Sequence, residues 1–180
     1  MSKSFIETYH NKVLHCIAQA VEEDLSGSGD HTSNAIFPTN HKSKAKLVAK
    51  GDGVLAGVDF CKIVLKHHAQ GVELTPLVID GHSFSNGETL LTLEGNTQYI
   101  LSLERILLNV LQRMSGIATV TNEIQQSIAH TKCKVLDTRK TTPNFRAAEK
   151  WAVQIGGGVN HRMGLYLSLI HISEPTRPFH

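Results

Sequence analysis

The sequence predicts an α/β protein built from three successive regions. The first region mixes helical and strand-like segments, which indicates an α+β arrangement. A long helical pattern follows from residue 97 to about 131. The last region begins as a strand, "KVLDT", continues as a helix and ends in a glycine-rich stretch. This last pattern is typical of a βα unit that opens a larger α/β architecture.

Helix and strand signals alternate through the first region. Apolar residues recur with a period near 3.6 from about Phe5 to Val21, which predicts an amphipathic helix. The glycine- and serine-rich "EDLSGSGDHTSNAIFP" predicts a loop after it. "KAKLVAKGDGVLAG" predicts two short strands around a Gly-Asp-Gly turn, and "VDFCKIVLKHH" predicts a helix. "VELTPLVIDG" and "ETLLTLEG" are strand-like and are separated by "HSFSNG", which contains an Asn-Gly turn signal.

The middle region is helical and carries an apolar stripe and a polar face. Ser115-Gly116 interrupts the pattern before apolar residues resume at Val120, so we expect two helices, or one broken helix, that join two domains. Arg105 lies on the polar face beside Glu104. Its spacing alone favours a solvated side chain.

Composition and cysteine usage restrict the class of protein. An apolar fraction of 41% and a charged fraction of 19% are ordinary for a globular chain. No stretch is long and apolar enough to span a bilayer, and the N-terminus lacks the pattern of a secretory signal. Cys16, Cys61 and Cys133 are odd in number and form no C-x-x-C pair. We therefore expect reduced, buried thiols in a cytoplasmic protein, although a reactive thiol stays open, and no zinc site or disulfide framework.

Positive charge is concentrated in one segment, from Asp137 to Gly164. The segment holds five cations and two acids, 5 − 2 = +3, so the rest of a chain with net charge +2 sums to −1. Local charge of this kind indicates a ligand site or a solvated face. The patch is short and aromatic residues make up only 6% of the chain, which argues against nucleic-acid binding. The cations are Arg139, Lys140, Arg146, Lys150 and Arg162.

Two pairs within this segment have the chemistry of an anion site. Arg139-Lys140 directly follows the predicted strand, and ligands of α/β folds bind at the carboxyl ends of strands. Together with His161-Arg162, they would suit a small ligand with two or more negative groups, because guanidinium pairs bidentately with carboxylate or phosphate. Composition leaves a site and a solvated face about equally open for these pairs.

The remaining features of the segment suggest ordinary roles. Arg146 and Lys150 lie four apart on the predicted helix, and we expect both to be simply solvated. The glycines of "GGG" end that helix and allow the backbone to bend or to approach a ligand closely. They match neither a GxGxxG pattern nor a P-loop, so they do not predict a nucleotide site.

Three long motifs resemble one known family. "LDTRKTTPNFRAAEKWAVQIGGGVNHRMGLY" resembles the barrel-domain signature of the quinolinate phosphoribosyltransferases, also called nicotinate-nucleotide pyrophosphorylases (carboxylating). "LERILLNVLQRMSGIATVTNE" resembles the interdomain helix of that family, and "EEDLSGSGDHTSNAIFP" its early loop. The resemblance implies an N-terminal α+β open sandwich domain (1–114), the start of an incomplete α/β barrel (115–166) and a tail unlike the family (167–180).

The resemblance also implies an enzyme, a pentosyl-transferring glycosyltransferase. Phosphoribosyl pyrophosphate and quinolinate would react, with decarboxylation, to give nicotinate mononucleotide, CO2 and pyrophosphate in NAD biosynthesis. Mg²⁺ would accompany the pyrophosphate, and a homodimer or higher homo-oligomer would share its sites, with Arg105 reaching the neighbouring subunit's site. This implied role replaces the expectation, from spacing alone, that the Arg105 side chain is solvated. The implied substrate-binding residues are Arg105, Thr138, Arg139, Lys140, His161 and Arg162, with Lys140 also catalytic.

The chain departs from the family pattern after Tyr166. A family lysine would fall at Ile172, and the later barrel acids that hold phosphoribosyl pyrophosphate and metal are missing, so we expect this chain to be an inactive fragment. Three alternatives stay open. They are a non-catalytic dimerising fragment, a phosphoribosyltransferase for another small anionic base, and a carrier module suggested by "HSFSNGETLLTLEG", which lacks the lysine that such modules modify.

Overall fold

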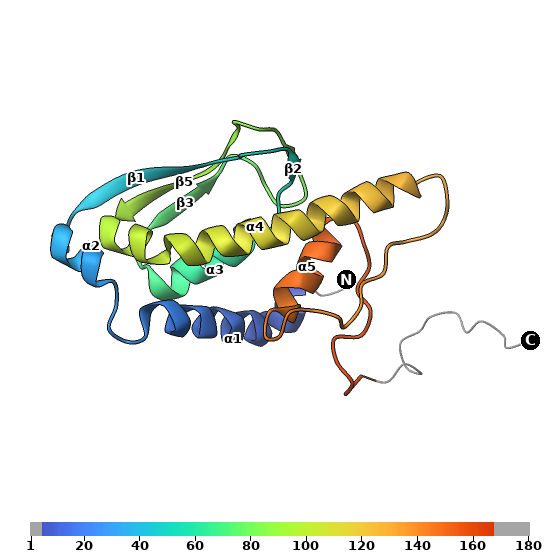
Figure 1. The fold of residues 1–180 in the computed structure, drawn as a ribbon, viewed down its shortest axis with the longest axis horizontal. Coiled ribbons are helices and arrows are strands. Elements are labelled where there is room, and N and C mark those ends of the chain that lie inside the picture. The colour runs from blue at the N-terminus through green and yellow to red at the C-terminus, as the bar shows by residue number, and fades with distance from the viewer. Residues whose placement is uncertain (1–4, 168–180) are drawn as a thin grey trace, which may run out of the picture.

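The computed structural model describes residues 5–167 of the chain. Three antiparallel strands form an outer layer in the order β1-β5-β3 (Figure 1). They are β1 (Lys42–Val48), β3 (Glu73–Pro76) and β5 (Thr89–Asn96). Leu91 and Leu93 of β5 are buried, while the neighbouring Glu94 is exposed. The alternation from Leu91 to Glu94 therefore marks a sheet with one face on the core.

Helices cover the inner face of this sheet. The predicted helix after the second strand is confirmed as α3 (Val58–His68), which lies beside the long helix α4 (Thr97–Ser127). The predicted N-terminal helix is confirmed as α1 (Phe5–Leu25), which packs against α3 and α4 on the side away from the sheet (Figure 1). Phe60 and Leu103 are fully buried where these layers meet.

Two details of the first region differ from the sequence expectation. The predicted loop contains a short helix, α2 (His31–Ile36), whose N-terminus is capped by Asp30 Oδ1 accepting from Ser33 N at 2.9 Å. The Gly-Asp-Gly turn does not join paired strands, because β2 (Gly53–Val54) pairs with β4 (Ser83–Phe84) in a separate two-stranded sheet. Val54 N also donates to Thr119 Oγ1 of α4, so β2 is drawn towards the helix.

The expected break at Ser115-Gly116 is wrong, because α4 runs through it as one helix of 31 residues. Ser115 Oγ donates to the Ala56 carbonyl at 3.2 Å and accepts from the Ala56 amide at 3.1 Å. Its hydroxyl is therefore satisfied outside the helix and does not compete with the helical hydrogen bonds. The expected domain boundary at 114/115 thus falls inside a continuous helix that contacts both β2 and α5 (Arg146–Ile155).

Gly116→Ala is expected to stabilise the protein by about 0.4–1 kcal/mol. Gly116 is helical and exposed, and a Cβ added there meets no atom within 4 Å, so alanine gains helix propensity without a clash. Urea denaturation followed by circular dichroism measures the change. A lower free energy of unfolding would contradict it. Gly156→Ala is the matched contrast and should destabilise, because its Cβ would lie 2.5 Å from the Ala118 carbonyl oxygen.

In the third region the predicted helix is present, but the predicted strand is not. The predicted helix is α5, which begins at Arg146 and packs on α4 and α1. The predicted strand "KVLDT" forms only an isolated parallel bridge, between Leu136 and Val159. This bridge joins the segments before and after α5, so their arrangement is that of a minimal β-α-β unit.

Two of the three cysteines have the buried environment that the sequence predicts. Cys16 and Cys61 are buried as expected, whereas Cys133 is exposed, which corrects the expectation for that residue. Burial raises the pKa of the Cys16 thiol to about 11 and raises that of Cys61 as well, so both stay protonated and are poor nucleophiles. No helix in residues 5–167 combines the length and apolarity needed to cross a bilayer.

Candidate anion-binding site

The predicted site residues lie on two segments that flank α5. We call residues 136–142 the first site segment and residues 159–163 the second site segment. The Leu136–Val159 bridge brings them side by side, and Asp137 N donates to the Val159 carbonyl at 3.2 Å. The first segment carries Thr138, Arg139 and Lys140, and the second carries His161 and Arg162.

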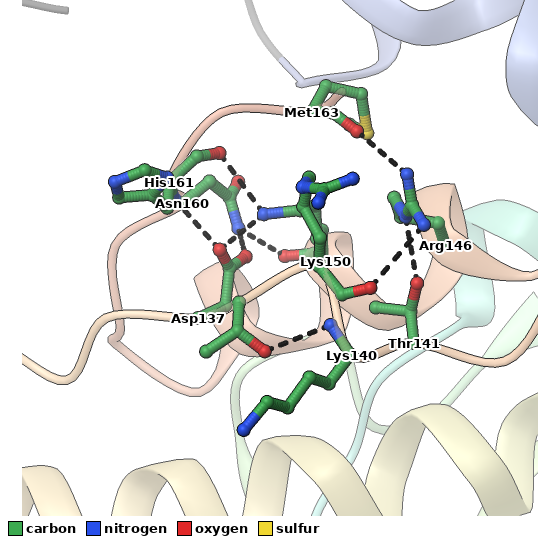
Figure 2. Close-up of polar contacts among 10 residues, drawn as sticks. Asp137, Lys140, Thr141, Arg146, Lys150, Asn160, His161 and Met163 are labelled. Carbon is green, nitrogen blue, oxygen red and sulfur yellow. Dashed lines mark hydrogen bonds and ion pairs between the residues drawn. The ribbon is translucent and has the colours of Figure 1, made fainter. Parts of the chain in front are cut away.

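Lys150 is buried beneath both segments, which overturns the expectation that it is solvated. Its side chain is 1% exposed and forms an ion pair with Asp137, whose side chain is 6% exposed. Lys150 Nζ also donates to the His161 carbonyl at 3.1 Å (Figure 2). A buried ammonium requires a paired charge and further acceptors, and these two partners supply both.

Asp137 connects the ion pair to the second segment. Its Oδ1 accepts from His161 N at 2.8 Å, and its Oδ2 accepts from Asn160 Nδ2 at 2.7 Å. Asn160 Nδ2 donates in addition to the Lys150 carbonyl at 2.6 Å. The backbone that presents His161 is therefore fixed by a network whose members are all satisfied, the condition under which a buried polar network is rigid.

Arg146 is also not simply solvated. Its side chain is half-buried, and all three guanidinium nitrogens donate hydrogen bonds. Nε donates to Thr141 Oγ1 at 2.8 Å and Nη2 to the Arg139 carbonyl at 3.4 Å, both in the first segment. Nη1 donates to the Met163 carbonyl of the second segment at 3.2 Å (Figure 2). The sequence spacing suggested a free helix face, but the fold places both site segments over it.

Glu149 fixes the end of the first segment. Its carboxylate is nearly buried and accepts from Thr142 N at 3.1 Å, from Thr142 Oγ1 at 2.9 Å and from Arg113 Nη2 at 2.7 Å. Arg113 belongs to α4, so the loop that carries Arg139 and Lys140 is tied to both helices. Glu149 and Lys150 together hold the first segment near its two ends, at Thr142 and Asp137.

The cations that remain lack an acidic partner among the described residues. Arg162 Nη1 donates to the Leu167 carbonyl at 3.5 Å. Among residues 5–167, neither Arg139, Lys140 nor Arg162 takes part in an ion pair, whereas the two acids of the segment, Asp137 and Glu149, are both occupied. The Lys140 side chain extends away from the Asp137–Lys150 pair (Figure 2). We call Arg139, Lys140, His161 and Arg162 the cation cluster.

Arg105 lies apart from the cation cluster, on an exposed turn of α4. It lines a hollow of about 450 Å³ together with Glu23, Asp24, Arg113 and Thr142. Five of the six predicted binding residues therefore lie on the two site segments. Arg105 lies on α4 instead, in a hollow that Thr142 of the first site segment also lines.

The triple glycine serves packing. A Cβ on Gly158 would lie 2.7 Å from Val153 Cγ1, and Gly157 has a φ of +92°, which side chains rarely adopt. With the contact of Gly156 to α4 described above, these positions let the chain turn closely between α5 and α4. The described atoms explain all three glycines without a ligand.

Sequence reasoning did not assign the supporting residues Asp137, Glu149, Lys150 and Asn160 to the site. One signal was available in "RAAEKWAV", where Glu149 and Lys150 stand between alanines and an aromatic residue. Two charges enclosed by apolar residues on both sides of a short helix indicate buried, paired charges rather than a solvated face. Residues 5–167 contain no group of three or more His, Cys, Asp or Glu side chains arranged to hold a metal ion.

The fold and the site together define a class: an α/β protein whose cation cluster lies on two segments joined by a parallel bridge on either side of a helix. Two family models match the chain, the N-terminal domain of quinolinate phosphoribosyl transferase over residues 30–115 and its C-terminal domain over 117–173. The chain belongs to the quinolinate phosphoribosyltransferase family. This membership decides against the carrier-module alternative.

Curated relatives agree with the family models. The nicotinate-nucleotide pyrophosphorylase (carboxylating) of Mycobacterium leprae is 41% identical over 151 residues, which cover 83% of this chain and 53% of that protein. The mitochondrial quinolinate phosphoribosyltransferase (decarboxylating) 2a of Nicotiana tabacum is 41% identical over 147 residues, covering 82% of this chain and 41% of that protein. The chain spans about half the length of the curated relatives it matches.

Solved structures share the fold. The nicotinate-nucleotide pyrophosphorylase of Francisella tularensis superposes with a TM-score of 0.79 at 36% identity, covering 87% of this chain and 55% of that one. The enzyme of Ehrlichia chaffeensis gives 0.76 at 33%, covering 92% and 57%. The expected fold class is thereby confirmed. Most of the expected tail, including Ile172, lies outside the described residues.

Proposed function

We propose that this chain carries the quinolinate-binding part of an enzyme that transfers a phosphoribosyl group from phosphoribosyl pyrophosphate to quinolinate, with decarboxylation to nicotinate mononucleotide. The proposal is supported by the names of relatives about 41% identical. The observation that carries it is the cation cluster, in which two arginines and a lysine without ion-pair partners lie on two segments joined by a parallel bridge and by the buried Lys150–Asp137 pair. Such a site favours a compact dianion over a neutral ring.

The roles follow from the chemistry of the ligand. Arg139, His161 and Arg162 bind the two quinolinate carboxylates, and Thr138 and Lys140 complete the same pocket. When the bond between the ring and the departing carboxylate breaks, its electron pair stays on the ring. Lys140 and the neighbouring guanidinium groups then stabilise this charge, and they act without reorganising because their segments are already fixed.

The proposed reaction also involves magnesium. Mg²⁺ would enter with phosphoribosyl pyrophosphate and balance the charge of the leaving pyrophosphate. The described residues offer no carboxylate cluster for Mg²⁺, so no step above depends on the metal.

We also propose a cytoplasmic location for the protein, in keeping with its three unpaired thiols.

Calorimetric titration of the chain with quinolinate tests the function. Saturable, enthalpically detectable binding that weakens as salt is raised is expected, because the interaction is between charges at a partly open site. Benzoate at equal concentration serves as the control ligand, with an aromatic ring and one carboxylate. No saturable binding of quinolinate, or equal binding of benzoate, would contradict the proposal.

We further propose that Arg105 acts in a second subunit's site within a homodimer, in keeping with its position away from the cation cluster. Mixing Arg105→Ala chains with Arg139→Ala chains should restore about one intact site per mixed dimer, because each subunit supplies what the other lacks. Quinolinate binding by the mixture measures this. If subunits exchange and the mixture binds no better than either parent, Arg105 does not act in trans.

A further inference from the structure

The guanidinium of Arg146 contacts both site segments directly, at the residues that follow the cations, whereas Lys150 contacts them at Asp137 and His161. The Arg146 guanidinium donates to the Thr141 hydroxyl and the Arg139 carbonyl on one side and to the Met163 carbonyl on the other. The three bonds use Nε, Nη1 and Nη2, so the planar fork spans the gap between the segments. Figure 2 shows these contacts converging on Arg146.

We propose that Arg146 is a positioning residue that sets the spacing between the two halves of the cation cluster, and thereby selects a ligand with two adjacent carboxylates. This inference rests on the proposed function. Arg139 and Lys140 lie directly before Thr141, and His161 and Arg162 directly before Met163, so fixing the latter two residues fixes the backbone next to each half. Arg146 does not itself need to contact the ligand.

The other contacts beneath the site explain why this role falls to Arg146. Lys150 and Asp137 tie the beginnings of the two segments together, and Glu149 holds Thr142 at the end of the first. Met163, near the end of the second segment, is buried, and its carbonyl accepts from Arg146. Without Arg146, the segments would still be joined at Asp137 and His161. They would not be joined at Thr141 and Met163, the residues that follow the cations.

A ligand that spans both halves should depend on this spacing, whereas a ligand that uses one half should not. Quinolinate carries two adjacent carboxylates, and nicotinate carries one on the same ring. When the halves are no longer fixed relative to each other, the dianion has to order them on binding, and this cost lowers its affinity. The ratio of the two dissociation constants therefore reports positioning, and a uniform loss of folded protein does not change that ratio.

The test compares Arg146→Lys with the wild-type chain. Lysine keeps the charge and the stem, but its single nitrogen cannot replace the fork. Calorimetric titration of the full chain should show quinolinate affinity reduced about tenfold, the loss of roughly one charge-assisted hydrogen bond. Nicotinate affinity should change less than about twofold. Gln154→Met, at an exposed position of the same helix, is the control and should leave both affinities unchanged.

Thr141→Val provides a second variant in case Arg146→Lys does not fold. It leaves α5 untouched and removes only the acceptor of Nε, so it should lower the quinolinate preference in the same direction by a smaller factor. An unchanged ratio in whichever of these variants folds, while wild-type chains prefer quinolinate, overturns the positioning role and leaves the proposed function standing. Failure of the wild-type chain to bind quinolinate at all overturns both.

Discussion

Arg139→Ala is expected to weaken quinolinate binding by about 1.5–3 kcal/mol, or roughly 10- to 150-fold in Kd. The guanidinium of Arg139 is half-buried and has no ion-pair partner among the described residues, so its charge is available to a ligand carboxylate. Removing it leaves that carboxylate with fewer donors in a partly desolvated site. Calorimetric titration with quinolinate measures the loss.

The control for this change must be a cation with no part in the site. Lys66 is exposed near the end of α3, and Lys66→Ala should leave Kd unchanged. Arg146, which the sequence pattern marked as solvated, is unsuitable because its hydrogen bonds support both site segments. Equal losses in Arg139→Ala and Lys66→Ala would show that only net charge matters, and unchanged affinity in Arg139→Ala would remove this residue from the site.

Asp137→Ala is expected to lower the free energy of unfolding by about 3–5 kcal/mol. The substitution leaves the Lys150 ammonium 1% exposed without its counter-charge, and it removes the acceptor for His161 N. A loss of this size is a large fraction of the stability of an ordinary domain. Urea denaturation, monitored by the fluorescence of Trp151, which follows Lys150 on α5, measures this loss of stability.

The double variant Asp137→Leu/Lys150→Met separates the cost of an unpaired charge from the value of the pair. Replacing both partners by apolar residues of similar volume should cost considerably less than Asp137→Ala, because no buried charge is then left alone. If the double variant is as unstable as Asp137→Ala, the hydrogen bonds from Asn160 and His161 matter more than the ion pair. A loss below about 1 kcal/mol in Asp137→Ala would contradict the buried pair itself.

The local elements could be predicted from the sequence wherever one face is apolar at a regular period. The helices at 58–68 and 97–127 follow from such stripes, and the alternation in "ETLLTLEG" marks β5, because periodicity is a property of neighbouring residues. The pairing of β2 with β4 could not be predicted in this way. The pairing joins Val54 to Ser83, which are far apart in the chain, and local periodicity does not record such partners.

The sequence by itself determined the family, the α/β class and the residues proposed for the cation cluster, because these are recorded in the order of side chains along one motif. The roles of Arg105, Lys140 and the other cluster residues stay predictions. Only the tertiary structure decided which cations are free. Lys150 and Arg146 lie on the same helix at the spacing of a solvated face, yet one is paired inside the protein and the other bridges two loops. The physical reason is that burial of a charge depends on partners brought by the fold, here Asp137 and the His161 carbonyl, and not on its neighbours in sequence.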